Sequence, residues 1–126
     1  MKQLIQTEAA PTPAGPYSQA LRVADFIFVA GQGPFEAETR KLVGTTIEEQ
    51  TAQTLDNIAV ILQAAGASMS DVVKVTVHLS DLELFSPFNE VYAGYFPDPQ
   101  PVRTTVGSRL RGFMVEIDVI AYVGNE

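Results

Sequence analysis

The chain has 126 residues, 46% of them hydrophobic and 18% charged, a composition typical of one soluble globular domain with an apolar core. Its formal net charge of −7, with eight Lys and Arg residues that form no run, argues against nucleic acid as a partner. The absence of cysteine and the presence of one histidine, His78, exclude thiol catalysis, disulfides and a multi-histidine metal site within one chain.

The N-terminal segment is predicted to be a turn-rich arm. Residues 1–16 mix proline, alanine and threonine, with a short strand at Lys2–Gln6 as an additional option. The segment has one lysine and no sustained apolar core, which is unlike a secretion signal. No apolar run in the chain reaches the roughly 18–20 residues that a membrane-spanning helix needs. We therefore expect a cytoplasmic protein without a membrane partner.

Two strands are predicted after this arm. Ser18–Val23 and Asp25–Gly31 have the β-branched and aromatic content of strands, and a loop follows to about Gly44. The loop begins with Gly31-Gln32-Gly33-Pro34. It does not match a phosphate-binding loop, because it lacks the lysine of that motif and does not open a helix directly.

A helix is predicted next. Thr45-x-x-Glu48 and Thr46-x-x-Glu49 are overlapping capping-box patterns, which favour a helix N-terminus. Gly66 is suited to the C-cap of this helix. Apolar residues recur between these ends at helical spacing, namely Leu55, Ile58, Leu62 and Ala65.

The second half of the chain predicts a strand, a helix and two strands. Val73–Leu79 alternates apolar and polar residues, as a strand with one buried face does. Ser86-Pro87 is a suitable N-cap and N1 pair for a second helix, which PDPQP ends. The last two strands are predicted at Val102–Leu110 and Phe113–Val123, joined by a turn that contains Arg111-Gly112.

The order β-β-α-β-α-β-β predicts an α+β sandwich, in which two helices lie on one face of a mixed sheet. We expect one domain over residues 1–126. In Phe113–Val123 both sides of the strand are apolar, with Val115 and Ile117 on one side and Ile120 and Tyr122 on the other. Two helices cover one face only, so the second face needs a cover, and another copy of the chain is the simplest one. A homo-oligomer is therefore predicted.

Charged residues in the last two strands are the main candidates for a site. Arg103 and Thr105 lie on one side of their strand, and Glu116 and Asp118 on one side of the next. Such charges are costly to bury unless they are paired or face a wet cleft. One interpretation is an Arg–Glu or Arg–Asp pair at a subunit interface. The other is that Arg103 binds a ligand carboxylate through two parallel hydrogen bonds, with Glu116 nearby as a proton-transfer group.

Other candidates are weaker on pattern alone. Tyr17 follows a Gly-Pro turn and is compatible with simple packing, and Asn89 with an exposed helix face. His78 has no evident partner in the sequence. Ser18 and Ser108 lack the histidine context that would make either a nucleophile.

Taken together, seven segments in order resemble the RidA (YjgF-type) family of reactive-intermediate deaminases. They are residues 14–20 (AGPYSQA), 29–34 (VAGQGP), 55–58 (LDNI), 73–77 (VKVTV), 88–92 (FNEVY), 101–106 (PVRTTV) and 115–121 (VEIDVIA). The resemblance implies a chorismate-mutase-like fold and a homotrimer with clefts between neighbouring subunits. It further implies hydrolysis of 2-imino acids, such as 2-iminopropanoate and 2-iminobutanoate, to 2-oxo acids and ammonia, with no cofactor and no metal.

The resemblance also implies roles for single residues. Arg103 matches the arginine that binds the substrate carboxylate, and Glu116 the acidic residue that positions the attacking water. Gly31 matches the position whose carbonyl holds the imine nitrogen, Tyr17 an aromatic residue of the pocket, and Asn89 a polar residue near it. Thr105 is a departure, because many members have cysteine there. Threonine preserves the function if that position contributes mainly a backbone N–H, whereas a role of the thiol would be lost.

Three alternatives stay open at this stage. The first is a non-catalytic trimer that binds 2-oxo acids or related metabolites through the same arginine. The second is a related deaminase of a catabolic pathway, acting on an aminomuconate- or aminoacrylate-type acid. The third is a ribonuclease or translation inhibitor, a label that some relatives carry. The acidic charge and the single histidine argue against the third.

Overall fold

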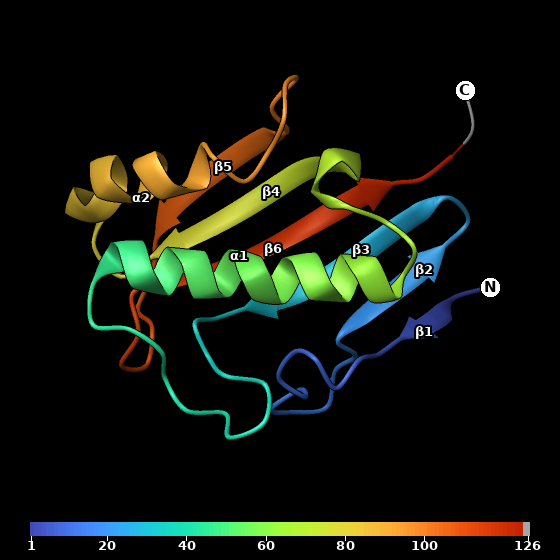
Figure 1. Ribbon diagram of the computed structural model, residues 1–126, viewed down its shortest axis with the longest axis horizontal. Coiled ribbons are helices and arrows are strands. Elements are labelled where there is room, and N and C mark those ends of the chain that lie inside the picture. The colour runs from blue at the N-terminus through green and yellow to red at the C-terminus, as the bar shows by residue number, and fades with distance from the viewer. Residues whose placement is uncertain (125–126) are drawn as a thin grey trace.

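A computed structural model describes residues 1–124, so the last two residues of the expected 1–126 domain lie outside the described residues. Its six strands form a single sheet, and its helices pack against that sheet (Figure 1). The strands are β1 (Gln3–Ile5), β2 (Ala20–Val23), β3 (Phe26–Gln32), β4 (Val72–Leu79), β5 (Val102–Gly107) and β6 (Val115–Tyr122). The helices are α1 (Ile47–Ala64) and α2 (Phe85–Tyr92), with 3₁₀ turns η1 (Met69–Asp71) and η2 (Leu82–Leu84).

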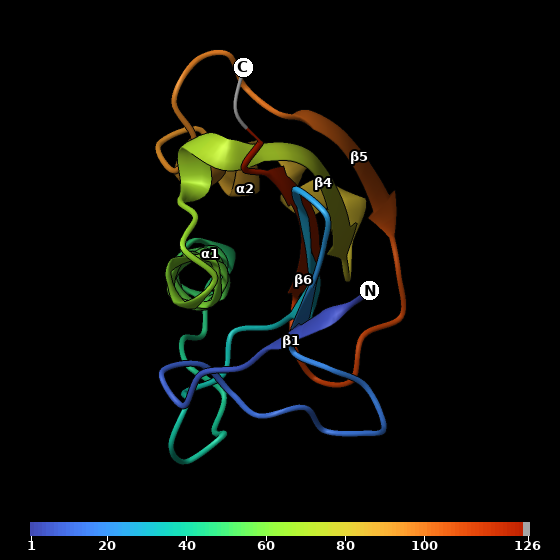
Figure 2. The same ribbon diagram turned by 90° about the vertical axis from the view of Figure 1, so that its right-hand side faces the viewer.

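The six strands form one mixed sheet in the order β1-β2-β3-β6-β4-β5. All neighbours are antiparallel except β4 and β5, which are parallel and are connected through α2. Both helices lie on the same face of the sheet, and the opposite face is bare (Figure 2). The predicted α+β arrangement with two helices on one face is confirmed. The core lies between the helices and the sheet, with Ile58 of α1 and Val77 and Ile117 of the central strands fully buried.

The ends of α1 follow from its sequence. The Thr46 hydroxyl accepts a hydrogen bond from the Glu49 N–H at 3.2 Å, and the Glu49 carboxylate accepts from the Thr46 N–H at 3.3 Å. Of the two overlapping capping boxes, the second one is therefore used. The backbone N–H groups of Thr45 and Thr46 also hold the pKa of Glu49 below its ordinary value. At the other end Gly66 has φ +80°, a left-handed conformation that costs glycine little.

The start of α2 differs from the prediction of Ser86 as N-cap. The helix begins at Phe85, directly after η2. Asp81 caps η2, because its carboxylate accepts a hydrogen bond from the Glu83 N–H at 2.9 Å. Pro87 is tolerated in the first turn because the N–H groups there have no partner within the helix. The strand predicted at Val102–Leu110 also ends earlier, at Gly107, because β4 ends at Leu79, the register partner of Gly107.

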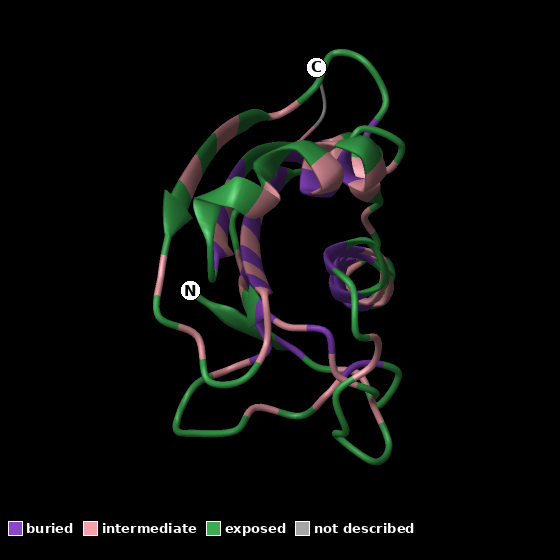
Figure 3. Cartoon of the chain, turned by 90° about the vertical axis from the view of Figure 1, so that its left-hand side faces the viewer, coloured by how far each residue is buried: buried purple, intermediate pink, exposed green. Residues whose placement is uncertain are grey.

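The bare face of the sheet is apolar in part. Phe26, Phe28 and Tyr122 are 41%, 42% and 37% exposed there, and the Phe26 and Tyr122 ring centroids lie 5.2 Å apart. Figure 3 shows how burial alternates along the strands between the covered and the bare face. In β6, Val115, Ile117 and Val119 are buried toward the helices, whereas Ile120 and Tyr122 lie on the bare side. Both sides of this strand are thus apolar, as predicted. The homo-oligomer stays a prediction.

Candidate functional site

Arg103 and Glu116 lie on opposite faces of the sheet. Arg103 is in register with the buried Val75, so it points toward the helices. Glu116 is in register with His78 and points to the bare face. Their positions are also separated by three residues along the strands and by two strand spacings, roughly 10 Å in each direction. A single chain therefore does not bring these two side chains to one small molecule.

Arg103 lies on β5 beneath α2, surrounded by aromatic rings. Its guanidinium carbon is 4.6 Å from the ring centroid of Tyr92 and 5.4 Å from those of Phe85 and Phe88. Stacking on ring faces stabilises a cation and leaves its N–H edge available. Across residues 1–124 the one ion pair is between Arg22 and Asp25, so no Asp or Glu described there neutralises Arg103. The ion-pair interpretation of Arg103 is thus not realised within one chain.

Polar atoms of β5 and α2, the elements around Arg103, have unused hydrogen-bonding capacity. The Thr105 hydroxyl and the Asn89 side-chain oxygen are buried, and no hydrogen-bond partner is found for them within residues 1–124. The Tyr92 hydroxyl is also buried, and its neighbour is the Arg103 guanidinium. Burial raises the pKa of Tyr92, while the charge of Arg103 opposes this shift. Leaving such groups unpaired typically costs about 1–3 kcal/mol each. The Tyr92 ring contacts the guanidinium, Thr105 lies on the same side of β5 as Arg103, and Asn89 lies on the helix that covers it. This part of the fold is therefore suited to an anionic ligand with further polar atoms.

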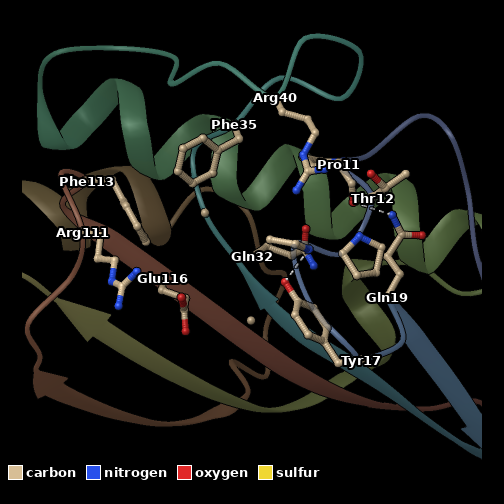
Figure 4. Close-up of a pocket in the computed structure, with 14 residues that line it drawn as sticks. Pro11, Thr12, Tyr17, Gln19, Gln32, Phe35, Arg40, Arg111, Phe113 and Glu116 are labelled. Carbon is tan, nitrogen blue, oxygen red and sulfur yellow. Dashed lines mark hydrogen bonds between the residues drawn. The ribbon is translucent and has the colours of Figure 1, made fainter.

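Glu116 belongs to a second group of residues, which surrounds a cavity of about 380 Å³ (Figure 4). The N-terminal arm, the loop after β3 and the turn between β5 and β6 form its walls. Tyr17, Gly31 and Glu116 lie on this cavity together with Phe113, Arg40 and Arg111. Phe35 and Phe113 close one side with an edge-to-face contact, their ring centroids 5.1 Å apart. The cavity thus combines a carboxylate, aromatic walls and two guanidinium groups.

Gly31 allows the carboxylate to lie against the backbone. A Cβ at Gly31 would come within 2.8 Å of Glu116 Oε2 and 3.0 Å of its Cδ, closer than side chains approach one another. The residue has no need of a left-handed backbone, so close approach is the reason for glycine at this position. The consequence is that the Gly31 peptide and the Glu116 carboxylate face the same small volume.

Three buried amides hold the loops around the cavity. Gln19 donates to the carbonyls of Thr7 and Pro11 at 3.2 and 2.9 Å and so fixes the N-terminal arm. Gln50 of α1 accepts from the Met114 N–H at 2.8 Å, at the start of β6. Asn57, also on α1, donates to the carbonyls of Gly33 and Phe35 at 3.1 and 2.9 Å. These loops therefore depend on polar contacts with the core.

The residues predicted from sequence thus fall into two groups. Tyr17, Gly31 and Glu116 meet at the cavity beside the N-terminal arm, whereas Arg103 and Thr105 lie under α2, the helix that carries Asn89. Sequence reasoning missed Arg40 and Arg111, because both lie in turns, where no periodicity indicates where a side chain points. It also missed the buried amides of α1, which look like an ordinary polar helix face.

His78 and Asp118 lie on the bare face near Glu116. The Nδ1 atom of His78 forms a 2.6 Å hydrogen bond with the Ser108 hydroxyl. Ser108 lies 30 residues further along the chain, so the sequence around His78 does not indicate this partner. Burial raises the pKa of Asp118, while the charges of His78 and Lys74 oppose this shift. Among residues 1–124, no three His, Asp or Glu side chains gather as a metal site would require. Within the same range, no helix combines the length and the apolar character needed to cross a membrane.

The chain is similar in sequence to known proteins over nearly its whole length. The model of the endoribonuclease L-PSP family matches residues 7–123. A RutC family protein of Pyrococcus abyssi is 52% identical over 123 residues, which are 96% of this chain and 97% of that protein. The chloroplastic Reactive Intermediate Deaminase A of Arabidopsis thaliana is 43% identical, over 95% of this chain and 65% of that protein. A 2-iminobutanoate/2-iminopropanoate deaminase of Dermatophagoides farinae is 38% identical, over 84% and 83%.

Solved structures agree with this relationship. The crystal structure of RidA from the Antarctic bacterium Psychrobacter has a TM-score of 0.91 and 40% identity, covering 96% of this chain and 99% of that one. Escherichia coli TdcF, solved with bound serine, has a TM-score of 0.88 and 31% identity, covering 95% and 98%. The likeness in fold and sequence therefore extends over nearly the whole chain.

Proposed function

Since this chain belongs to the endoribonuclease L-PSP family, which includes the YjgF and RidA proteins, we propose that it is a hydrolytic deaminase of 2-imino acids. Its products are 2-oxo acids and ammonia, and its own side chains supply the chemistry without a cofactor. The observation that carries this proposal is the pair of complementary groups: a ring-stacked arginine that no Asp or Glu among residues 1–124 neutralises, and a cavity in which a carboxylate lies against the backbone of β3.

The proposal requires two copies of the chain to build one site. The carboxylate carbon and the imine carbon of a 2-imino acid are bonded neighbours, whereas Arg103 and Glu116 of one chain lie on opposite faces of the sheet. Arg103 of one copy must therefore meet the cavity of the next. The exposed aromatic cluster of the bare face and the unpaired outer edge of β5 supply surface for this contact. A homotrimer with a cleft at each interface satisfies this requirement.

The residues then have the following roles. Arg103 binds the substrate carboxylate through two parallel hydrogen bonds. Thr105 on β5 and Asn89 on α2 supply further oxygens without a partner among residues 1–124. The Gly31 carbonyl accepts a hydrogen bond from the imine nitrogen, and Tyr17 lines the pocket. Holding the imine in one orientation beside the water removes part of the entropic barrier.

Hydrolysis of the protonated imine needs one proton acceptor that later acts as a donor. The water oxygen bonds to C2, Glu116 takes one water proton, and the π electrons of the C=N bond move to nitrogen. Glu116 then returns the proton to nitrogen, the C–N bond breaks, and the hydroxyl proton leaves with ammonia as ammonium. A positioned acid–base group of this kind typically accelerates a reaction about 10²–10⁴-fold.

Mixing two inactive variants tests the shared site. Arg103→Ala and Glu116→Gln are each expected to lose activity while still assembling. When the two are unfolded together in equal amounts and refolded, about a quarter of the interfaces combine an intact Arg103 with an intact Glu116, so about a quarter of wild-type turnover returns. The measurement is 2-oxo acid formation from 2-iminobutanoate released by a coupled dehydratase. No recovery in a mixture shown to contain hybrids would refute a site built from two copies, and full activity of Arg103→Ala would refute the deaminase mechanism.

Binding without turnover is the second candidate. It is favoured by the serine bound to TdcF, since an amino acid there has the same carboxylate that a 2-oxo or 2-imino acid offers. The two candidates predict different rates of imine hydrolysis, and Glu116→Gln separates them. A binding protein saturates with 2-oxobutanoate but leaves the rate of imine hydrolysis at the level of free solution, whereas the deaminase loses turnover in Glu116→Gln and keeps its affinity for 2-oxobutanoate.

A further inference from the structure

Two arginines at the cavity have no role in the proposed hydrolysis. Arg40 and Arg111 both line it, and neither has an Asp or Glu oxygen within 4.0 Å in the part of the chain that the structure describes. The chain carries a net charge of −7 and only eight Lys and Arg residues. Two of these eight at one cavity of about 380 Å³ make a local positive region in an otherwise repulsive field.

Arg40 is held at the cavity by a strained turn. Its φ is +62°, in the left-handed region where glycine or asparagine is the usual residue. The turn is closed by the Glu36 N–H donating to the Lys41 carbonyl at 2.9 Å and the Arg40 N–H donating to the Glu36 carbonyl at 2.8 Å. A turn alone would be formed more easily by glycine, so the long cationic side chain is the distinctive contribution of this position.

Arg111 reaches the cavity from another wall. It lies in the turn between β5 and β6, directly before Gly112, whose φ of +83° gives that turn its shape. In Figure 4 Arg111 lies beside Glu116, and Arg40 lies across the cavity above Gln32 and Tyr17. The ring of Phe113 belongs to the same cavity, so an apolar wall accompanies the two cations.

We propose that this cavity selects 2-imino acids whose side chain ends in a second carboxylate. This inference rests on the proposed deaminase function and names its substrate class. With the first carboxylate on Arg103 of the neighbouring copy and C2 beside Glu116, the substrate side chain extends along Phe113 and its terminal carboxylate meets Arg111 and Arg40. The two guanidinium groups offset the repulsion that Glu116 and the acidic surface exert on a dianion.

Chain-matched substrates test this selection. Amino-acid oxidases generate 2-iminosuccinate and 2-iminobutanoate, or 2-iminoglutarate and 2-iminopentanoate, which differ only in the terminal carboxylate. Competition with semicarbazide, which traps the imine, gives kcat/KM for each. We expect the wild-type enzyme to prefer a dicarboxylate over its partner by about tenfold or more, the scale of a charge-assisted hydrogen bond. Raising the salt concentration is expected to weaken the preference, because the two arginines are exposed.

Single charge removals locate the selectivity. Arg111→Gln and Arg40→Gln are each expected to lower the ratio of dicarboxylate to monocarboxylate kcat/KM, and the double variant to abolish the preference. Arg109→Gln is the matched control: it removes the same charge from the same turn, but Arg109 does not line the cavity, so the ratio is kept. Equal ratios in the wild type and the double variant, with both imines accelerated, would overturn the selectivity and leave the deaminase intact. Acceleration of neither imine would overturn both.

Discussion

At the scale of single residues, Gly31 determines where the Glu116 carboxylate can lie. Gly31→Ala places a methyl group within 2.8 Å of Glu116 Oε2, and the flexible end of that side chain can move away without disturbing the core. We therefore expect almost no loss of stability but a fall in kcat of about tenfold to a hundredfold, since a displaced base no longer meets the water. Steady-state kinetics and denaturant unfolding measure the two effects. A variant with normal kcat would show that the position of this carboxylate does not control turnover.

Asp118 gives the fold a pH dependence of its own. Burial raises its pKa, so its ionised form is disfavoured in the native state. Its contribution to stability is fully present below the ordinary pKa of aspartate and is lost as the pH rises through the raised native pKa. Asp118→Asn is therefore expected to raise the free energy of unfolding by roughly a few tenths of a kcal/mol at neutral pH. Urea unfolding at equal protein concentration should show that this gain disappears at about pH 3. A gain of the same size at neutral pH and at acidic pH would contradict a raised pKa of Asp118 as its cause.

At the scale of elements, α1 holds the loop after β3 through Asn57. Asn57→Ala leaves the carbonyls of Gly33 and Phe35 without their donor, which we expect to cost about 1–3 kcal/mol of stability and to raise KM as the cavity wall loosens. Gln63→Ala is the matched control, since Gln63 is an exposed amide of the same helix and its side chain forms no hydrogen bond with Asn57 or the loop among the described residues. Unfolding and kinetics of both variants decide the matter. Equal effects would mean that Asn57 acts through general packing of the helix.

The elements themselves were largely predictable, whereas their mutual arrangement at the site was not. The capping box at Thr46 and the alternation along β4 and β6 are local signals, and the structure follows them. Strand alternation also groups Arg103 with Thr105 and Glu116 with Asp118. It does not say which of the two sides faces the helices, because that depends on how β4, β5 and β6 pair in register. For this reason the division of the site into two groups is visible only in three dimensions.

At the scale of the whole molecule, the bare face of the sheet connects assembly with activity. If Arg103 works only beside the cavity of another copy, any change that separates the copies must also stop turnover. Phe28→Asp places a charge in the aromatic cluster of that face, at a side chain that is 42% exposed in one chain, so the fold of the monomer is expected to tolerate it. Burying an unpaired carboxylate at an interface is costly, and the oligomer is expected to dissociate.

The expected outcome is a coupled loss. Size-exclusion chromatography with light scattering should show Phe28→Asp as a monomer, with normal secondary structure by circular dichroism and activity reduced by at least about a hundredfold. Raising the protein concentration should restore both properties together by mass action. Leu42→Asp is the matched control, because Leu42 is a similarly exposed apolar residue, at 45%, in the loop before α1, and should change neither property. A Phe28→Asp monomer with full activity would show that one chain contains a complete site, and an unchanged active oligomer would show that the copies meet through another surface.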